Sequence, residues 1–328
     1  MNVFITFDYE LFFGSDSGSI EKCMILPTNR LIEMSIKQNV NFTYFVDAGY
    51  LVKLKLFSKQ FPVLEKDYSL VSKQLKSLVE NGDSIQLHIH PHWERSFYDG
   101  DKWVFEIDGN YALSDFESEE VSIIIKKYKE ALESIISKPV TSYRAGGLAV
   151  QPFSNIKQDL LKSNIVIDSS VQNFGYKSTN SYAFDFREAP NKGRYRFESD
   201  VCKEEGEGSF LEMPIAGWKY SRFFYLKLYL LGFLFPSKHK FIGDGNYVPT
   251  PNEKKIKLLY SRFDNISCDG FYCSKLIKAF KSFKKTGRTD TVVLGHPKSQ
   301  TLFSLKQLDK TIFYTKEKYN YSTFDDLK

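Results

Sequence analysis

Residues Leu87–Trp93 read LHIHPHW and hold three of the chain's five histidines within five consecutive positions. The apolar residues before them, entered through Asn81-Gly82, predict a buried strand that follows a helix ending at glycine. His88 then lies at the carboxyl end of the strand, the edge where α/β folds bind ligands. Two imidazoles four positions apart on the following loop can reach one divalent metal if a carboxylate completes the set. The alternative is that these rings only pack near Trp93 or are polar groups on the surface.

Four other segments end in the same way, with a short apolar run followed by a polar side chain. They are Val3–Phe7 before Asp8 and Glu10, Val140–Tyr143 before Arg144, Ile165–Ile167 before Asp168, and Thr291–Gly295 before His296. Helical patterns lie between them, for example over Asp67–Glu80 and Ser118–Ser137. A repeated order of strand, polar tip and helix predicts parallel βαβ units, and therefore an α/β fold.

Composition and charge narrow the class of protein. The 328 residues are 42% hydrophobic, enough to bury a sizeable core, and they show no repeat or linker-like stretch. We therefore expect one domain over 1–328, with an aromatic and basic insertion near 219–250. The net charge of +5 is too mild to indicate nucleic-acid binding. The 16% aromatic content favours a cleft lined by rings.

The cysteines and the N-terminus bear on location. Cys23, Cys202, Cys268 and Cys273 form no Cys-x-x-Cys pair, which is typical of reduced thiols in a cytosolic protein. The first eight residues lack the basic region, long apolar run and cleavage site of a signal peptide. We expect a cytoplasmic protein whose first strand begins at once.

The side chains at the predicted strand ends form the inventory of a metal hydrolase. In such an enzyme a metal polarises a carbonyl, a carboxylate takes a proton from water, and an imidazole protonates the leaving amine. No single strand end is specific for this chemistry. The order of these residues along the chain and their shared position at strand ends make the prediction of a metal hydrolase more specific.

With these motifs in place, the chain resembles the polysaccharide deacetylases, the NodB-homology or carbohydrate esterase family 4 proteins. The resembling segments are Thr6-Phe7-Asp8-Tyr9-Glu10, the pair His88 and His92 with Trp93, Arg144-Ala145-Gly146-Gly147, Asp168, and Leu294-Gly295-His296. The resemblance implies a distorted (β/α) barrel with about seven parallel strands. It also implies removal of N-acyl groups, usually acetyl, from sugars with a divalent metal. Zinc is the expected metal, with cobalt and nickel as alternatives.

The resemblance also implies a role for each residue. Glu10, His88 and His92 would bind the metal, and Asp8 would be the catalytic base. Arg144 would hold Asp8 ionised, and Asp168 would orient His296 as the general acid. By alternation along the chain we expect His90 to face away from its neighbours.

The first motif departs from the family pattern, because Tyr9 stands where the family has its usual metal-binding aspartate. A neutral phenol is a poor ligand at pH 7. Side chains at i and i+2 of a strand share a face, so Asp8 and Glu10 point together and Tyr9 points away. Glu10 is therefore the expected carboxylate ligand, and an inactive, metal-free site is the alternative.

Three other functions stay open at this point. A non-catalytic glycan-binding relative would keep the cleft but lose the base or the acid, and both Asp8 and His296 are present. A deformylase acting on a formamido sugar would use the same residues. A phosphoesterase with a His-x-His signature matches His88 and His90, but it usually needs further histidines for a second metal.

The substrate is expected to be an N-acylated sugar of a cell-surface polysaccharide or glycolipid precursor. Phe223–Phe235 is rich in rings and leucines, contains Lys227, and precedes Lys238 and Lys240. It is shorter than the roughly 20 residues that span a bilayer. A core helix is the leading interpretation of this segment. The alternative is a peripheral contact with the inner face of a membrane, where a lipid-linked saccharide would be the substrate.

Overall fold

The computed structural model describes residues 1–250 and 252–327, and its centre is a nine-stranded sheet. In spatial order the strands are β10 (Tyr195–Phe197), β11 (Phe210–Glu212), β7 (Ile167–Asp168), β6 (Ser142–Ala145), β3 (Ser84–Ile89), β2 (Thr43–Asp47), β1 (Asn2–Tyr9) and β14 (Asp290–Gly295), with β15 (Asn320–Tyr321) beside the start of β1. Neighbouring strands are parallel except for β10 and β11. The predicted α/β fold with a mostly parallel sheet is confirmed.

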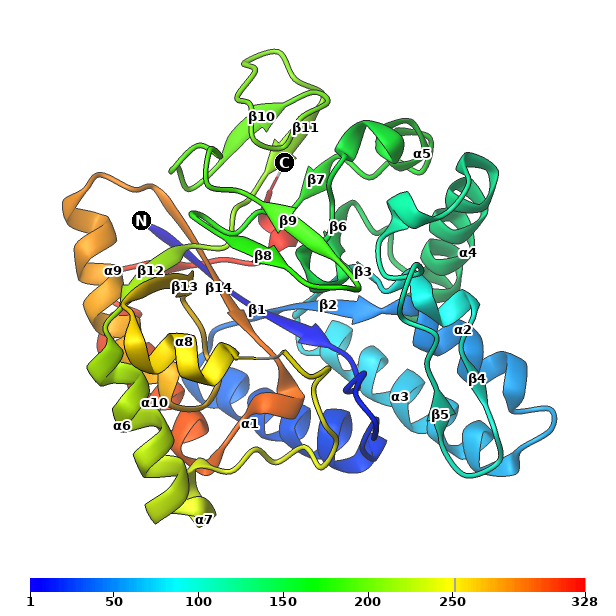
Figure 1. Ribbon diagram of the computed structural model, residues 1–328, viewed down its shortest axis with the longest axis horizontal. Helices are drawn as coiled ribbons and strands as arrows, with labels where there is room; N and C mark the ends of the chain where they lie inside the picture. Colours follow the sequence, from blue (N-terminus) through cyan, green and yellow to red (C-terminus); the bar gives the residue numbers. More distant parts are fainter. Residues whose placement is uncertain (251, 328) are drawn as a thin grey trace.

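The sheet curls into a partial barrel (Figure 1). After β11 the chain crosses toward β14, where Ile215 forms isolated bridges with both Gln172 and Val292. These bridges connect the two sides of the curled sheet. The apolar core inside and around it includes residues from Val3 to Phe324.

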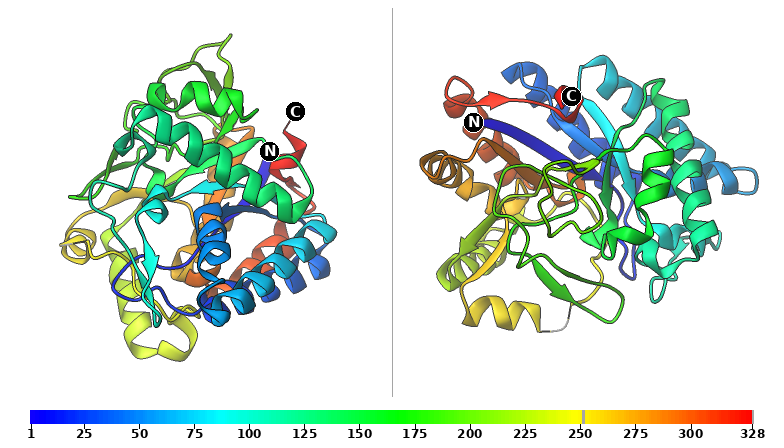
Figure 2. Two further views of the ribbon diagram at one scale, coloured as in Figure 1. Left: turned by 90° about the vertical axis from the view of Figure 1, so that its right-hand side faces the viewer. Right: turned by 90° about the horizontal axis from the view of Figure 1, so that it is seen from above.

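Ten α-helices belong to the described part of the chain. They are α1 (Leu26–Gln38), α2 (Ala48–Phe57), α3 (Pro62–Glu80), α4 (Ser118–Ile136), α5 (Lys157–Lys162), α6 (Arg222–Leu234), α7 (Pro236–His239), α8 (Glu253–Leu259), α9 (Leu276–Lys285) and α10 (Leu302–Thr315). Figures 1 and 2 show them around the outside of the strands. The amphipathic pattern of α4 follows from this arrangement, because the helix buries one face, which includes Val121, Ile125 and Leu132. None of the described helices is long and apolar enough to cross a membrane.

Three antiparallel two-stranded pairs lie outside the main sheet. They are β4 (Phe97–Tyr98) with β5 (Trp103–Val104), β8 (Tyr176–Ser178) with β9 (Ala183–Asp185), and β12 (Gly217–Tyr220) with β13 (Arg262–Asn265). The turn residues Asp99-Gly100 before Trp103–Phe105 predict the first. The polar stretch from Asn173 to Gly208 predicts a loop, but β8 and β9 form there. Helical spacing predicts a helix from Asn252 to Phe263, whereas α8 ends at Leu259. The antiparallel partner β12 takes residues 262–265 into a strand, a non-local pairing that helical spacing does not reveal.

Candidate active site

Strand register brings the polar side chains to one edge of the sheet. Asp47 of β2 pairs with His88 of β3, and His88 pairs with Arg144 of β6. Glu10 follows the end of β1, which is the neighbour of β2. Since parallel strands end on the same side, residues far apart in sequence meet there. Tyr9 points away, as alternation predicts, and its hydroxyl donates to Gln74 of α3 at 2.7 Å.

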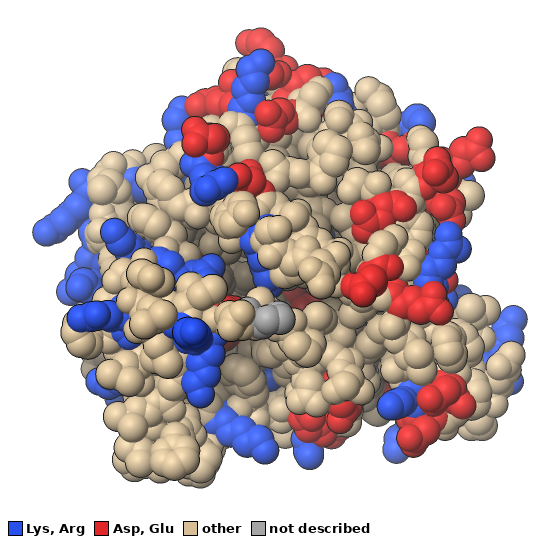
Figure 3. Space-filling model, in the orientation of Figure 1, with Lys and Arg blue, Asp and Glu red and all other residues tan. Residues whose placement is uncertain are grey.

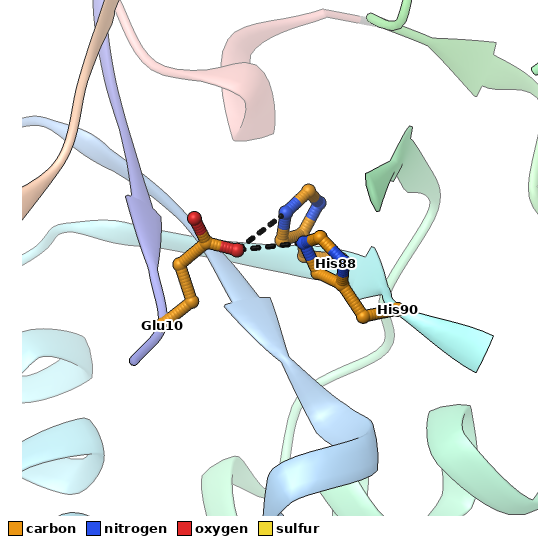
Figure 4. A group of neighbouring side chains, drawn as sticks. All are labelled: Glu10, His88 and His90. Carbon is orange, nitrogen blue, oxygen red and sulfur yellow. Dashed lines mark hydrogen bonds and ion pairs between the residues drawn. The ribbon is translucent and has the colours of Figure 1, made fainter. Parts of the chain in front are cut away.

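Glu10, His88 and His90 form a buried group whose ligand atoms all lie within 4.8 Å of one another. The same carboxylate oxygen of Glu10, Oε2, is 3.2 Å from Nε2 of His88 and 2.7 Å from Nε2 of His90 (Figure 4). The side chains are at most 7% exposed. This group can hold a metal ion.

The hydrogen bonds of His88 support that fit. Its Nδ1 lies 2.9 Å from the carbonyl oxygen of Arg144, and because a carbonyl only accepts, Nδ1 carries a proton. In the neutral form of the ring, Nε2 presents a lone pair to an oxygen of Glu10. Two acceptors in contact repel unless a proton or a metal ion lies between them. One carboxylate oxygen and two imidazole nitrogens are ligands that suit zinc and its neighbours.

The charge states of the group are set by burial and by neighbouring ions. Burial lowers the pKa of His90 to about 4, so its ring is neutral at pH 7 and available as a ligand. Burial acts in the same direction on His88, but the carboxylates of Asp8 and Glu10 outweigh it and raise the pKa of His88. Burial alone would raise the pKa of Glu10, yet Lys298 and the histidines hold it well below its usual range. Glu10 is therefore ionised.

The structure differs from the sequence expectation for the second histidine. His90, not His92, lies against Glu10. His90 keeps an extended backbone (φ −105°, ψ 97°), and residues two apart in an extended segment share a face, so its ring follows that of His88. The expectation that His90 faces away was wrong. A 3₁₀ turn over Pro91–Glu94 then carries His92 elsewhere.

His92 lies in an aromatic pocket behind the group. Its ring centroid is 4.6 Å from that of Phe13 and 5.5 Å from that of Phe105. Nδ1 is 3.4 Å from the Ser96 hydroxyl, and Nε2 has no hydrogen-bond partner among the described residues. Burial holds the pKa of His92 well below its usual range, so the ring is neutral. At this position His92 packs against the aromatic rings beside the site and makes no contact with Glu10.

The position of His90 depends on a glycine. A Cβ atom added to Gly146 would lie 2.5 Å from Nδ1 of His90, closer than side chains tolerate. Gly146→Ala should therefore displace the ring and weaken zinc binding by at least about tenfold, the cost of disturbing a ligand's support. Calorimetric zinc titration measures this. Gly206→Ala is the control, because nothing lies within 4 Å of the added atom. Equal affinities of the two variants would show that His90 does not bind the metal.

Asp8 and Arg144 form a buried ion pair beside the group. Nη1 of Arg144 donates to Oδ1 of Asp8 at 2.6 Å and to the Thr6 hydroxyl at 3.0 Å. The other guanidinium nitrogens donate to the carbonyl and hydroxyl of Ser169, and the guanidinium stacks 3.9 Å from the ring centroid of Phe45. Oδ1 of Asp8 is thus fixed, while Oδ2 faces Nε2 of His88 and of His296 at 3.9 and 3.8 Å. This leaves one oxygen of Asp8 directed at the site.

His296 approaches from the end of β14, with its Nε2 3.8 Å from both Asp8 and Glu10. Its orienting carboxylate is Asp269, which accepts from the ring Nδ1 at 2.7 Å and from the backbone N–H at 2.8 Å. Burial lowers the pKa of His296, but the charge and hydrogen bond of Asp269 prevail and raise it. The sequence contains no strand signal at Asp269; it lies in the loop after β13, and tertiary folding brings it to the histidine.

Asp168 does not contact His296, which corrects the expected pairing. Asp168 lies at the end of β7, two strands away from β3. Its carboxylate accepts hydrogen bonds from the hydroxyl and the N–H of Ser170 at 2.7 and 3.1 Å. Its register partner on β11 is Glu212, also buried. Burial raises the pKa values of both carboxyls. Through its bonds to Ser170, Asp168 supports the strand end that carries Ser169 and Ser170.

Lys298 is a part of the site that sequence reasoning missed. It is 2% exposed, and its Nζ donates to Oε1 of Glu10 at 2.8 Å and to the carbonyl of Leu11 at 2.6 Å. Nζ also lies 4.8 Å from the ring centroid of Phe12. The sequence feature that could have indicated it is its position two residues after the strand-end histidine, His296. Lys298 occupies one oxygen of Glu10 and leaves the other to the histidines.

Two cavities of about 660 and 610 Å³ lie elsewhere on the molecule. The first is lined mainly by 151–154 and by the β8–β9 hairpin, and the second by residues around Trp218 and Arg288. Neither contains a residue of the group around Glu10. The converging polar atoms around Glu10, and not the size of a cavity, therefore mark the candidate active site.

Comparison with solved structures identifies the fold. A Mycobacterium smegmatis protein assigned as a polysaccharide deacetylase superposes with a TM-score of 0.53 at 14% identity, over 99% of this chain and 88% of that one. The predicted distorted barrel of the polysaccharide deacetylases is thereby confirmed as the fold of this chain.

Two further matches are more distant. The carbohydrate esterase family 4 domain of a xylanase from the hindgut metagenome of Trinervitermes trinervoides has a TM-score of 0.42 at 10% identity, covering 99% of this chain and 88% of that one. A pseudoenzyme of that family from Bacillus anthracis has 0.43 at 10% identity, covering 99% and 64%. No protein-family model and no curated protein sequence matches this chain.

Proposed function

From the fold that it shares with the polysaccharide deacetylases, we propose that this chain is a metal-dependent hydrolase of N-acylated sugars. The observation that carries the proposal is the convergence of Asp8, Glu10, His88, His90 and His296 at one edge of the sheet. Acetyl is the proposed acyl group. The substrate is proposed to be a sugar of a cell-surface polysaccharide or glycolipid precursor.

Glu10, His88 and His90 would hold the metal, with zinc as the first candidate. A divalent metal held there supplies Lewis-acid chemistry, because it polarises the acyl carbonyl oxygen. Lys298 balances the second oxygen of Glu10, and the hydrogen bond from His88 to the Arg144 carbonyl fixes the tautomer that a ligand needs.

Asp8 and His296 would divide the proton transfers between them. Oδ2 of Asp8 takes a proton from the attacking water, while Arg144 keeps the carboxylate in place through Oδ1. Nε2 of His296 gives a proton to the nitrogen of the leaving amine, and Asp269 holds the ring through Nδ1. Nε2 of His296 lies 3.8 Å from Oδ2 of Asp8, so the proposed acid and the proposed base border the same position beside the Glu10 group.

Release of acetate from N-acetylglucosamine oligosaccharides, with and without added zinc, tests the proposal. Formate release from an N-formyl sugar distinguishes the deformylase alternative. A binding-only relative would hydrolyse neither substrate. It would also have little need for Asp269, which contacts the acid and not the metal group.

The pH profile of hydrolysis gives a prediction for Asp269. Activity requires protonated His296, so it should fall as the pH rises through the raised pKa of that ring. Asp269→Asn removes the charge that raises the pKa, and the alkaline limb should move to lower pH. Asp168→Asn serves as the control and should leave that limb in place. If only Asp168→Asn moves the limb, the pairing of His296 with Asp269 does not govern the acid.

A further inference from the structure

Helix α6 leaves an apolar stripe uncovered on the surface. Among its residues only Phe224 and Tyr225 are buried, and they pack with Tyr220 and Tyr272. On the opposite face Phe223, Leu226, Leu230 and Phe233, spaced at helical intervals, are 66, 55, 50 and 81% exposed. Leu234 and Phe235 extend the stripe toward α7 at 53 and 49%. The core-helix interpretation of Phe223–Phe235 therefore accounts for only one face of the helix.

Basic side chains surround this stripe. Arg222 and Lys227 are exposed on α6, and Lys238 and Lys240 are exposed on and after α7. In Figure 3 the uncharged bulge at the lower left is formed by these helices, with Lys and Arg around it. Acidic side chains gather instead over the top and right of that view.

The charge segregation is also visible along the chain. Residues 217–288 contain 15 Lys and Arg against 4 Asp and Glu. The rest of the chain has 30 against 36, so the net charge of +5 hides a strongly cationic region. Apolar side chains among cations suit the boundary of an anionic lipid bilayer, where rings enter the acyl region and lysines meet headgroups. A nucleic acid would use the cations and leave the exposed Leu226, Leu230 and Leu234 unexplained.

We infer that α6 and α7 dock this protein on an anionic membrane surface. The stripe is a helix face lying on the bilayer, not a span. Each exposed phenylalanine adds apolar burial, and each nearby lysine adds electrostatic attraction that salt weakens.

The docking surface is directly connected to the candidate active site. The chain leaves α7 and runs beside the segment that carries Lys298, with Ile242 N–H donating to the Gln300 carbonyl at 2.8 Å and Gly243 N–H to the Lys298 carbonyl at 3.1 Å. Tyr247 then packs against Phe12, with ring centroids 4.8 Å apart. A sugar carried on a lipid would thus be presented near the group around Glu10. This choice of substrate rests on the proposed function, whereas membrane docking does not.

Flotation of the full-length protein with vesicles tests the docking. We expect binding to phosphatidylcholine vesicles that contain phosphatidylglycerol at low salt, weaker binding at high salt, and little binding to phosphatidylcholine alone. Phe223→Ser with Phe233→Ser should reduce binding by at least about tenfold, since burying one such ring is worth that much. Lys238→Ala with Lys240→Ala should also reduce it by roughly thirtyfold, from the combined attraction of the two charges to the surface.

Matched controls lie on α4, whose exposed surface carries Glu119 and Glu130. Ile123 there is 61% exposed, so Ile123→Ser removes an equally accessible apolar side chain away from the stripe. Lys126→Ala removes an exposed lysine from the same helix. Both variants should float like the wild type, and circular dichroism should show all variants folded.

Several results would overturn the docking. They are no flotation at low salt, flotation unchanged by the double phenylalanine variant, and equal losses in the α4 controls. A dimer in solution that Phe233→Ser dissociates, without flotation of either protein, would show that a second copy covers the stripe. Retention on DNA without flotation would assign the cations to a nucleic acid.

The substrate part has its own readout. The double phenylalanine variant should lose turnover of a synthetic N-acetylglucosamine glycolipid in vesicles by about tenfold or more, while it keeps turnover of a water-soluble oligosaccharide. Equal loss on both would contradict presentation from the membrane. If neither substrate is hydrolysed, the proposed function fails, and flotation of the Asp8→Asn variant still decides the docking.

Discussion

Replacing Asp8 by asparagine should remove most of the hydrolytic activity while leaving metal content unchanged. The amide keeps the shape of the side chain but cannot accept the water's proton, and a positioned base is worth about 10²–10⁴-fold in rate. Metal should stay bound, because Asp8 lies beside the Glu10, His88 and His90 group without belonging to it. Steady-state kinetics and elemental analysis of the same preparation measure both quantities.

The matched variant is Glu10→Gln, which changes the neighbouring carboxylate just after β1. It should lose the metal and the activity together. If Asp8→Asn turns over at the wild-type rate, or loses its metal while Glu10→Gln keeps it, the roles of the two carboxylates are exchanged. The two variants test the carboxylates separately, since Arg144 holds Asp8 and does not contact Glu10.

Replacing His90 by alanine should abolish metal binding, whereas replacing His92 by alanine should retain it. Nε2 of His90 lies 2.7 Å from the Glu10 oxygen, and His92 lies among Phe13, Trp93 and Phe105. Losing a direct ligand should cost more than the roughly 10–100-fold that follows from losing only its support. Protein purified without chelator should hold about one metal ion per chain, and elemental analysis of the variants decides between the histidines.

A stability measurement separates ligation from folding. His92→Ala opens space in a packed aromatic region and should lower the melting temperature, since truncating buried side chains is destabilising. Zinc should raise the melting temperature of His92→Ala and leave that of His90→Ala unchanged, because only a bound ligand stabilises the folded state. The opposite pattern would restore His92 as the ligand, as the sequence motif suggests.

Much of the architecture follows from local sequence. Short apolar runs that end in polar residues predicted β1, β3, β6, β7 and β14, and the amphipathic spacing of residues 118–137 predicted α4 almost to the residue. Alternation along β1 separated Tyr9 from Asp8 and Glu10. Such patterns are readable because burial repeats every two residues in a strand and every 3.6 in a helix. They also placed the polar tips at the carboxyl edge of a parallel sheet, where the candidate site lies.

What the sequence could not determine is which side chains meet once the strands have ended. The expectation that His90 faces away fails because the backbone stays extended up to Pro91, so the alternation that places Asp8 with Glu10 also places His90 with His88. Asp269 lies in a segment without a strand signal, and Lys298 is marked only by its position two residues after His296, yet they hold His296 and Glu10. Asp168 has the position that the motif suggests but faces Ser170 and Glu212. Beyond a strand end, direction depends on turns and on non-local packing, so these contacts exist only in the tertiary structure. The exposure of α6 has the same origin, because its composition fits a core helix and only the absence of a covering element among the described residues leaves Phe223 and Phe233 in solvent.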